Sequence, residues 1–252
     1  MPHDPGRVLL VGAGPGAADL LTVRAARAVA EAQALLYDAL VPQEILDLAP
    51  ASCLKIQTGK RAGRTSMAQT TINRLMVRLA RRGLDVVRLK GGDPSVFGRV
   101  GEEMAVLKAA GIEAQVIPGV TAAAAAAAQF GFPLTHRGQA RRVVLTTARL
   151  DQGSLAEDWR AAADPEATLA IYMGGAAAGA IRDRLIAAGR SAATPILAVE
   201  NAGRPAARLF TGVLGGLAET VPADLDGPVL IVVGDVAAQA VEAAPALTEL
   251  AS

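Results

Sequence analysis

The chain has 252 residues, just over half of them hydrophobic, and its 25 lysines and arginines almost cancel its 24 aspartates and glutamates. A chain of this length and hydrophobicity suits two compact domains or one large one and is not typical of a disordered protein, and its balanced charge argues against a protein that coats nucleic acid. With one cysteine and two histidines, the chain is not expected to form an internal disulfide or a metal centre built from these residues.

The N-terminus, MPHDPGRVLL, lacks the basic start and long apolar run of a signal peptide. The alanine run at residues 122–128 is too short and too weakly apolar to span a bilayer. We therefore expect a cytoplasmic protein without a membrane partner.

The first predicted strand, residues 7–11, leads into the glycine-rich turn GAGPGA at residues 12–17, and a helix is predicted from Asp19. The turn contains the G-x-G-x-x-A pattern of dinucleotide-binding folds, and Asp38 follows the second predicted strand, residues 34–37, about where such folds place a ribose-binding carboxylate. A nicotinamide-dependent oxidoreductase is therefore one interpretation, although Pro15 removes a backbone N–H that would face a pyrophosphate. Asp38 can equally be a cap of the following helix.

The third predicted strand, residues 53–58, ends in the loop GKRAGRTS. Three cations stand between its glycines, which suits a site that grips carboxylates or phosphates but also a solvated basic loop. They are Lys60, Arg61 and Arg64. The helix predicted next, residues 68–82, has an apolar stripe at helical spacing with arginines outside it, which we interpret as ordinary surface.

Residues 85–103, DVVRLKGGDPSVFGRVGEE, form the most informative stretch. An apolar strand stops at Gly91 and Gly92, which let the backbone approach a ligand, and at Pro94, which cannot continue a ladder. Asp93 is thereby placed at the carboxyl end of a strand, where α/β sheets bind their ligands. Helical spacing then resumes, with two glutamates in the first turn, where they suit the helix dipole.

The fifth predicted strand, residues 114–117, meets PGVT, and the alanine run then predicts a helix. Thr121 suits an N-cap, and its hydroxyl would face the same edge of the sheet as Asp93. Five strands thus end in glycine-rich or polar turns, and in a parallel sheet all five turns open on one edge. We therefore expect an α/β fold with a parallel five-stranded N-terminal sheet and a site at that edge.

Residues 130–142 look like a linker into a second α/β unit, in which His136 is a polar turn residue or a proton carrier. Met173 ends a strand beside glycines and suits either core or an apolar ligand wall. An NAGRP turn joining two strands indicates a mixed sheet, and we expect domains at residues 1–129 and 130–252. In the second domain, strands are predicted at 143–147, 167–172, 196–199, 208–211 and 229–233, and helices at 155–163, 177–188 and 215–220.

Eight segments of the chain together resemble the tetrapyrrole methylase family. VGAGPG and GGDP are typical of the whole family, and YDALV, GKRAG and PLTHRG are similar to its members that methylate uroporphyrinogen III. The segments are VGAGPGAADLLT (11–22), YDALV (37–41), GKRAG (59–63), VRLKGGDPSVFGR (87–99), PGVTAA (118–123), PLTHRG (133–138), YMG (172–174) and VENA (199–202).

The resemblance implies two α/β domains with the active site in the cleft between them, and a homodimer. It implies C-methylation of uroporphyrinogen III by S-adenosylmethionine (SAM), giving precorrin-2 for sirohaem or cobalamin synthesis and S-adenosylhomocysteine as the other product. A sibling methylase acting on a later corrin precursor is the nearest alternative, and a binding module without catalysis is a further one.

By the same resemblance, Asp38 would be the proton acceptor and Lys60 a proton donor, although the sequence leaves open whether Asp38 or Arg99 manages the protons. The residues implied to bind SAM are Pro15, Gly91, Gly92, Asp93, Val96, Thr121, Ala122, Met173 and Ala202. The substrate carries many carboxylates, for which the expected partners are Arg61, Arg64, Arg99 and Arg137.

Overall fold

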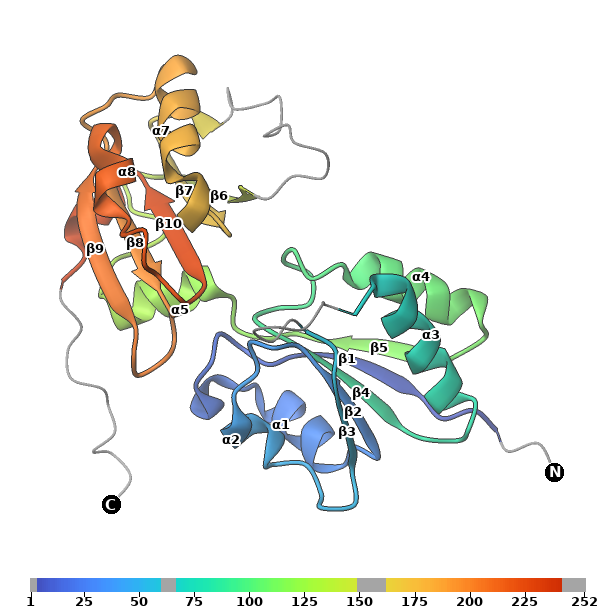
Figure 1. The fold of residues 1–252 in the computed structure, drawn as a ribbon. Helices are drawn as coiled ribbons and strands as arrows, with labels where there is room; N and C mark the ends of the chain where they lie inside the picture. The colour runs from blue at the N-terminus through green and yellow to red at the C-terminus, as the bar shows by residue number, and fades with distance from the viewer. Residues whose placement is uncertain (1–3, 60–66, 149–161, 242–252) are drawn as a thin grey trace, which may run out of the picture. The chain divides into compact units, whose positions relative to one another are not determined.

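The computed structural model describes residues 4–59, 67–148 and 162–241 and divides into two compact units, residues 1–121 and 122–252 (Figure 1). Each unit holds one five-stranded sheet. The division lies at Thr121–Ala122, before the predicted boundary at 129–130, because helix α5 (Ala122–Gln129) packs within the second unit. Its buried Ala123 and Ala126 belong to one hydrophobic cluster with side chains of the second sheet.

The sheet of the first unit is parallel throughout, as predicted. Its strand order is β3-β2-β4-β1-β5. The strands β1, β2 and β4 are almost entirely buried, which explains their continuous apolar runs. The five strands are β1 (Val8–Gly12), β2 (Ala34–Tyr37), β3 (Leu54–Gln57), β4 (Val86–Lys90) and β5 (Ala114–Ile117), all close to their predicted bounds.

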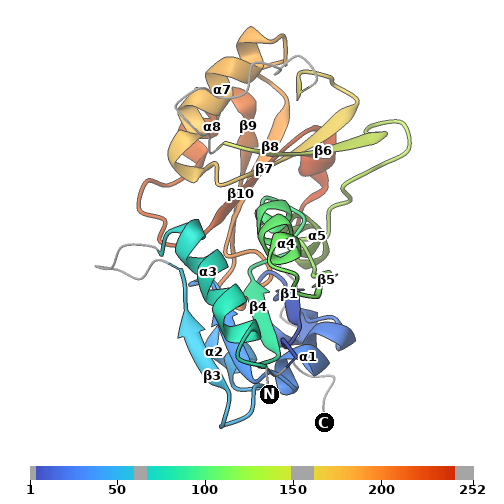
Figure 2. The same ribbon diagram turned by 90° about the vertical axis from the view of Figure 1, so that its right-hand side faces the viewer.

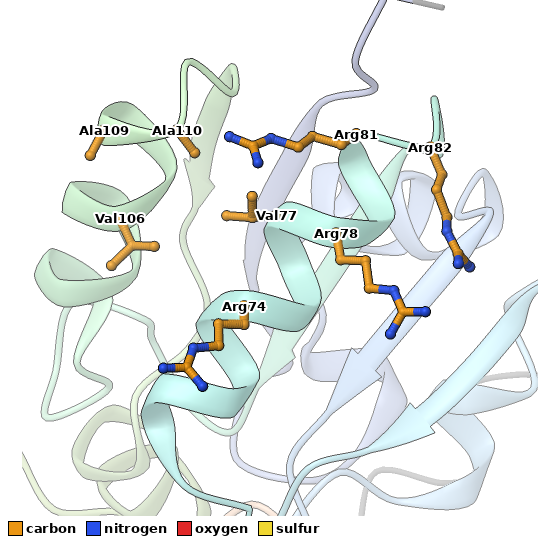
Figure 3. Close-up of a pocket in the computed structure, with 8 residues that line it drawn as sticks. All are labelled: Arg74, Val77, Arg78, Arg81, Arg82, Val106, Ala109 and Ala110. Carbon is orange, nitrogen blue, oxygen red and sulfur yellow. The ribbon is translucent and has the colours of Figure 1, made fainter.

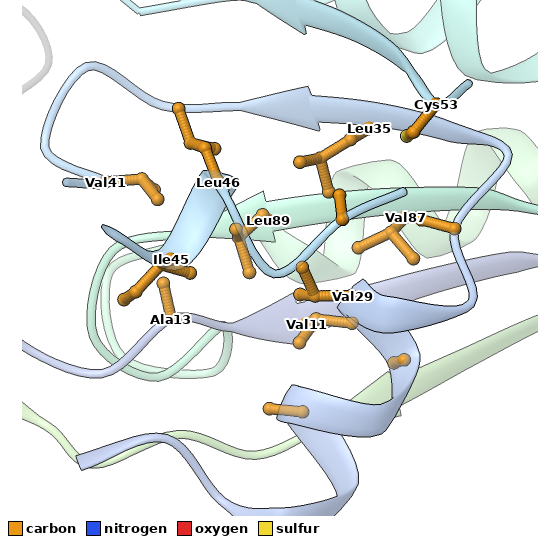
Figure 4. Close-up of a cluster of buried hydrophobic side chains, with 14 of the residues drawn as sticks. Val11, Ala13, Val29, Leu35, Val41, Ile45, Leu46, Cys53, Val87 and Leu89 are labelled. Atoms are coloured by element: carbon orange, nitrogen blue, oxygen red, sulfur yellow. The ribbon is translucent and has the colours of Figure 1, made fainter. Parts of the chain in front are cut away.

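Helices cover both faces of this sheet. Helices α1 (Val23–Ala30) and α2 (Gln43–Leu46) pack on one face, in the cluster drawn in Figure 4, and α3 (Gln69–Ala80) and α4 (Val100–Ala109) pack on the other. The right-handed rule for crossovers accounts for this, because the chain moves one way through the sheet after β1 and β2 and the other way after β3 and β4. The chain therefore passes from the neighbouring strands β1 and β4 to helices on opposite faces, and sheets of this kind bind ligands at the carboxyl ends of such a strand pair.

The first helical segment differs from the prediction. A 3-10 turn, η1 (Ala18–Leu20), comes first, and α1 begins only at Val23, where the Thr22 hydroxyl accepts a hydrogen bond from the Ala25 N–H at 3.1 Å. The glycine-rich turn at residues 12–17 is therefore not the N-terminus of a helix. Dinucleotide-binding folds use that N-terminus to hold the pyrophosphate, so the structure argues against the nicotinamide interpretation.

The sheet of the second unit is mixed, as predicted, with strand order β6-β7-β10-β8-β9. Only β6 and β7 pair in parallel. The helix predicted at 155–163 lies almost wholly outside the described residues. The strands are β6 (Arg142–Thr147), β7 (Ala167–Tyr172), β8 (Pro195–Glu200), β9 (Arg208–Val213) and β10 (Val229–Val233).

Alternate residues of the central strands of this sheet supply two separate cores. The helical segments of this unit after β6 are η3 (Gly175–Ala177), α7 (Ala178–Ala187), η4 (Leu214–Gly216), α8 (Leu217–Thr220) and η5 (Asp235–Gln239). Leu169 and Ile231 face α7 and α8, seen beside the sheet in Figure 2, whereas Ala170 and Val232 face α5 and η5.

Candidate active site

Three loops meet through their backbones at the carboxyl edge of the first sheet. Gly14 N donates to Gly92 O at 3.2 Å, and Gly92 N donates to Gly14 O at 2.7 Å, which joins the loops after β1 and β4. A Cβ on Gly119, in the loop after β5, would lie 2.4 Å from Gly92 O, and one on Gly12 would lie 2.6 Å from Gly119 N. Only glycine allows this approach, so the part of the edge formed by these glycines presents backbone atoms.

Asp93 ties two of these loops together. Its Oδ1 accepts a hydrogen bond from the Ser95 N–H at 2.7 Å, within its own loop, and its Oδ2 accepts one from the Gly119 N–H at 3.0 Å. The carboxylate thus fixes the loop after β4 against the loop after β5. Any role of Asp93 in cofactor binding would include this support of the backbone.

The structure brings the predicted cofactor residues of the first unit to one sheet edge. Pro15 lies in the loop after β1, and Val96 lies beyond Asp93 in the loop after β4. Thr121 lies at the end of the unit, after β5. All three are half-buried, as are Gly91, Gly92 and Asp93.

Below Asp38 lies a set of charged side chains that we call the buried charge network: Asp38, Arg88, Lys90 and Glu103. Arg88 Nη2 lies 2.5 Å from Asp38 Oδ1, and Arg88 Nε lies 3.3 Å from Glu103 Oε1. Lys90 Nζ lies 2.9 Å from Glu103 Oε2 and 3.0 Å from Oε1. Arg88 and Lys90 are each 3 % exposed and Glu103 is fully buried, whereas the Asp38 side chain is 31 % exposed. The network therefore runs from the interior to a partly accessible carboxylate.

Neutral polar groups complete these contacts. The Thr58 hydroxyl accepts from Arg88 Nη1 at 3.1 Å and donates to Tyr37 O at 3.0 Å, and Gln69 Nε2 donates to Glu103 Oε1 at 3.0 Å. Burial lowers the pKa of Lys90, the neighbouring Arg88 charge lowers it further, and the Glu103 carboxylate opposes both effects. Two cations and two carboxylates balance, which is how proteins tolerate buried charge.

Sequence reasoning missed Arg88, Lys90 and Glu103. We assigned Glu103 to the helix dipole, but its carboxylate faces β4 and pairs with Lys90. A signal was present: Arg88 and Lys90 stand at alternate positions of a strand that is buried on both faces. Cations in such a strand require buried counter-charges, since unpaired charges are almost never buried.

Arg99, a predicted substrate contact, lies in the loop after β4 with a left-handed backbone (φ 57°). Its guanidinium forms two hydrogen bonds with the Glu102 carboxylate, at 2.8 and 2.7 Å. Both side chains are exposed, and hydrogen bonding to Arg99 lowers the pKa of the Glu102 carboxyl. Arg99 is thus accessible but already engaged with a carboxylate.

In the second unit, Met173 and Ala202 follow β7 and β8. Both strands pair antiparallel with β10, so their carboxyl ends lie at the same edge. The Ala123 N–H donates to Tyr172 Oη at 3.3 Å, which brings the start of α5, including Ala122, to the end of β7. Met173 is 45 % exposed beside a groove of about 530 Å³, and Ala202 is buried. The three predicted cofactor residues of this unit therefore share one edge of its sheet.

Backbone strain marks the same loops. Among the described residues, the non-glycine residues with positive φ are Phe97, Arg99, Met173 and Asn201. They lie in the loops after β4, β7 and β8, the loops that carry predicted site residues. Such conformations cost about 1–3 kcal/mol each and cluster at functional sites, which supports the choice of these loops.

Other predicted residues are not placed with these groups. Lys60, Arg61 and Arg64 lie outside the described residues. Arg137 is exposed, and its carbonyl oxygen lies 2.8 Å from His136 Nδ1. A hollow of about 710 Å³ between α3 and α4 (Figure 3) is lined by surface arginines and holds none of the predicted site residues.

Residues 4–59, 67–148 and 162–241 contain no group of three or more His, Cys, Asp or Glu side chains arranged to hold a metal ion. No helix among them has the length and apolar character that crossing a membrane requires.

Comparison with known proteins gives consistent matches. The family model for tetrapyrrole (corrin/porphyrin) methylases matches residues 7–218. Siroheme synthase 1 of Yersinia pseudotuberculosis serotype I (strain IP32953) is 47 % identical over 231 residues, which cover 92 % of this chain and 49 % of that protein. Siroheme synthase 1 of Serratia proteamaculans (strain 568) is 48 % identical over 231 residues, covering 92 % and 48 %. The chain thus spans about half the length of the curated relatives it matches.

Solved structures match over nearly their whole length. The native form of uroporphyrin III C-methyl transferase from Thermus thermophilus has a TM-score of 0.78 and 40 % identity, covering 92 % of this chain and 93 % of that one. A structure of that enzyme complexed with S-adenyl homocysteine gives the same values. A cobalt precorrin-4 methyltransferase has a TM-score of 0.81 and 28 % identity, covering 90 % and 94 %.

Proposed function

This chain belongs to the tetrapyrrole methylase family, and from that premise we propose that it transfers methyl groups from SAM to two pyrrole carbons of uroporphyrinogen III. The product would be precorrin-2, formed by way of precorrin-1. The observation that carries the proposal is the 40 % identity, over 92 % of this chain, to the uroporphyrin III C-methyl transferase of Thermus thermophilus. Family membership also replaces the nicotinamide interpretation of the GAGPGA turn.

The carboxyl edge of the first sheet suits this cofactor. SAM carries a positive sulfonium whose charge disappears as the methyl group leaves, so close backbone contact is more useful than cationic side chains. The joined loops around Gly14, Gly92 and Gly119 provide such a surface. We assign SAM binding to Pro15, Gly91, Gly92, Asp93, Val96 and Thr121 in the first unit and to Ala122, Met173 and Ala202 in the second.

In the proposed reaction, a pyrrole carbon forms a bond to the methyl carbon while the methyl–sulfur bond breaks. Sulfur keeps the electron pair, which leaves S-adenosylhomocysteine, and the ring gains a positive charge. Orientation supplies much of the rate of such an in-line displacement. A proton must then leave the ring, and a base that accepts it contributes about 10²–10⁴-fold. We assign this role to Asp38, whose carboxylate is partly exposed at the sheet edge, and the donor role to Lys60.

The substrate carboxylates need cationic partners, for which we propose Arg61, Arg64, Arg99 and Arg137. Arg99 shows how such a contact would form, since its exposed guanidinium already binds a carboxylate, that of Glu102. A substrate carboxylate would share or replace that partner.

One alternative has specific support. The cobalt precorrin-4 methyltransferase has a TM-score of 0.81, against 0.78 for the Thermus thermophilus enzyme. A sibling reaction on a later corrin precursor therefore fits the fold equally well. Sequence identity is 28 % to the cobalt precorrin-4 methyltransferase and 40 % to the Thermus thermophilus enzyme, which favours uroporphyrinogen III as the proposed substrate.

The biological setting is also a proposal. The siroheme synthases are about twice as long as the matched region, so only the methylation step is carried over from them. We place that step in sirohaem or cobalamin synthesis. A homodimer in the cytoplasm remains the expectation from the family resemblance.

The test is anaerobic incubation with SAM and enzymatically generated uroporphyrinogen III, followed by mass spectrometry. A product heavier by two methyl groups supports the proposal. No product, with SAM binding intact by calorimetry, would favour the later-precursor alternative. No binding of SAM would contradict the cofactor assignment itself.

A further inference from the structure

The partly exposed carboxylate of Asp38 is the outer end of the buried charge network, and Arg88 is the group that holds it there. We propose that Arg88 is a positioning residue, which fixes the Asp38 carboxylate in the orientation needed to accept the substrate proton, and that Glu103 and Lys90 fix Arg88 in turn. The inference rests on the proposed function, in which Asp38 is the proton acceptor.

The contacts of Arg88 leave its guanidinium little freedom. Nη2 reaches Asp38 Oδ1 at 2.5 Å, Nη1 reaches Thr58 Oγ1 at 3.1 Å, and Nε reaches Glu103 Oε1 at 3.3 Å. All three nitrogens are thus engaged, in the planar fork that distinguishes arginine from lysine. With the side chain 3 % exposed, Arg88 is a rigid base for the carboxylate above it.

The contacts of Asp38 are one-sided. Arg88 and Thr58 both approach Oδ1, at 2.5 and 3.4 Å. Oδ2 is the oxygen that the described residues do not engage, and the side chain is 31 % exposed. A carboxylate held by one oxygen and accessible at the other has the geometry of an oriented base.

Glu103 neutralises the remaining charge of the network. Asp38 pairs with Arg88 alone, which would leave Lys90 buried without a counter-charge, and the Glu103 carboxylate accepts hydrogen bonds from both cations. Buried ion pairs contribute little net stability, and apolar residues of similar size often replace them without loss. The position of this network, directly beneath a carboxylate at the ligand-binding edge, points to a role in the site rather than in stability.

The experiment is a double-mutant cycle between Arg88→Met and Asp38→Asn, with turnover measured anaerobically and SAM affinity measured by calorimetry. Arg88→Met should lower kcat by about 10²-fold, the effect of misplacing a reacting group by an ångström. SAM affinity should stay close to that of the wild type. Arg88→Lys, which keeps the charge without the fork, should recover only part of the loss.

The variant that combines Arg88→Met with Asp38→Asn tests whether Arg88 positions Asp38 or only supports the fold. If Arg88 acts through Asp38, adding Arg88→Met to Asp38→Asn lowers turnover no further. Losses that multiply would overturn the proposal. Arg190→Met, which removes an equally buried arginine in the second unit, is the control and should leave kcat unchanged in folded protein. If Arg88→Met does not fold, the same cycle is run with Arg88→Lys.

A structural readout keeps this inference apart from the proposed function. In a crystal structure of Arg88→Lys, the Asp38 carboxylate should leave its place beside Thr58, and an unmoved carboxylate would overturn the inference whatever the activity. Failure of the proposed function would instead appear in the wild type, as absent methyl transfer, or in Asp38→Asn, as undiminished turnover.

Discussion

The two edges of the first sheet carry the same residue types in opposite circumstances. At the amino end of β4, Asp85 accepts hydrogen bonds from Arg7 N at 3.1 Å and Arg7 Nε at 3.2 Å, and the two side chains are 44 % and 50 % exposed. At the carboxyl end, Arg88 and Glu103 form a similar pair at 3.3 Å but are 3 % and 0 % exposed. One pair is a surface feature, and the other lies within the protein.

The difference shows where the fold contains an energetically unfavourable arrangement. Exposed ion pairs lose little solvation and contribute little to stability, whereas the attraction between buried charges must offset a large desolvation free energy. The buried charges of this sheet and the left-handed Phe97 and Arg99 lie at the carboxyl edge. Close glycine contacts occur at both edges, since a Cβ on Gly6, before β1, would lie 2.2 Å from Leu84 O. In α/β sheets this edge binds ligands, so local strain there is consistent with function.

The largest effect is expected from Glu103→Gln. Loss of this carboxylate leaves Arg88 and Lys90 buried without their shared counter-charge, and breaking a buried pair costs about 3–5 kcal/mol of unfolding free energy. Arg7→Met, at the other edge, should cost at most about 1 kcal/mol. Urea unfolding of both variants measures these losses, and equal losses of unfolding free energy would show that burial does not distinguish the two pairs.

The next largest effect is expected on SAM affinity, which Asp93→Ala, at the carboxyl edge, should lower and Asp85→Ala, at the amino edge, should not. Without the carboxylate, the Gly119 N–H loses a charged acceptor, an interaction of about 1.5–3 kcal/mol, and the loops after β4 and β5 loosen. SAM binding should weaken about 10-fold or more, since each 1.4 kcal/mol is a factor of ten. Asp85→Ala is the matched control, because it removes a carboxylate that also accepts from backbone. Calorimetry showing unchanged SAM affinity in Asp93→Ala would remove Asp93 from the site.

A pair of glycines tests the tight backbone contacts. Gly119→Ala places a Cβ 2.4 Å from Gly92 O and should cost about 1–3 kcal/mol, as overpacking does, and weaken SAM binding. Gly111→Ala, before β5, meets no atom within 4 Å but has φ +69°, so it should cost about 1–2 kcal/mol with SAM binding intact.

Substitution by asparagine distinguishes a steric clash, expected at Gly119, from the strain of a left-handed backbone, expected at Gly111. Gly111→Asn should recover stability, since asparagine tolerates a left-handed backbone, whereas Gly119→Asn should be no better than Gly119→Ala. Thermal unfolding without SAM gives the stability of each variant, and the shift of Tm with SAM reports its binding. Higher stability of Gly119→Asn than of Gly119→Ala would mean that the neighbouring loops move apart and are not close-packed.

Much of this fold follows from local sequence patterns. Buried parallel strands need continuous apolar runs, and glycine-rich turns end them, so the strands of the first unit were predicted nearly to the residue. The start of α1 was not predicted correctly, because the 3-10 turn before it has a spacing similar to that of a helix. The unit to which α5 belongs was not predicted either, because an alanine run carries no information on which sheet it packs against.

The site was predictable only in part, for a physical reason. Within each unit, the predicted cofactor residues lie near strand ends, which the topology of that unit's sheet brings to one edge. The buried charge network instead joins Asp38 to Arg88 across 50 positions, and Arg88 to Glu103 on the following helix. No periodicity encodes such contacts. The sequence shows only that two cations lie in a buried strand, not which carboxylates reach them.

The smallest expected effect refines the comparison between the edges. The Arg99–Glu102 pair lies at the carboxyl edge but is exposed, like Arg7–Asp85 at the amino edge. Hydrogen bonding to Arg99 lowers the pKa of Glu102 below its ordinary value of 4.5. The pair therefore stabilises the folded protein above that pH, and the contribution disappears as the pH falls through the lowered pKa.

Glu102→Gln should accordingly reduce Tm slightly at neutral pH and not at all once Glu102 is protonated, and added salt should shrink the difference because the pair is exposed. Thermal unfolding of the wild type and Glu102→Gln across acidic and neutral pH, at low and high salt, measures this. A small, screened effect would mean that burial, rather than position at the carboxyl edge, distinguishes the buried charge network from ordinary ion pairs. A large effect that resists salt would mean that the edge itself strengthens its charges, and Arg99 would then belong with Arg88 among the groups that the fold holds in place.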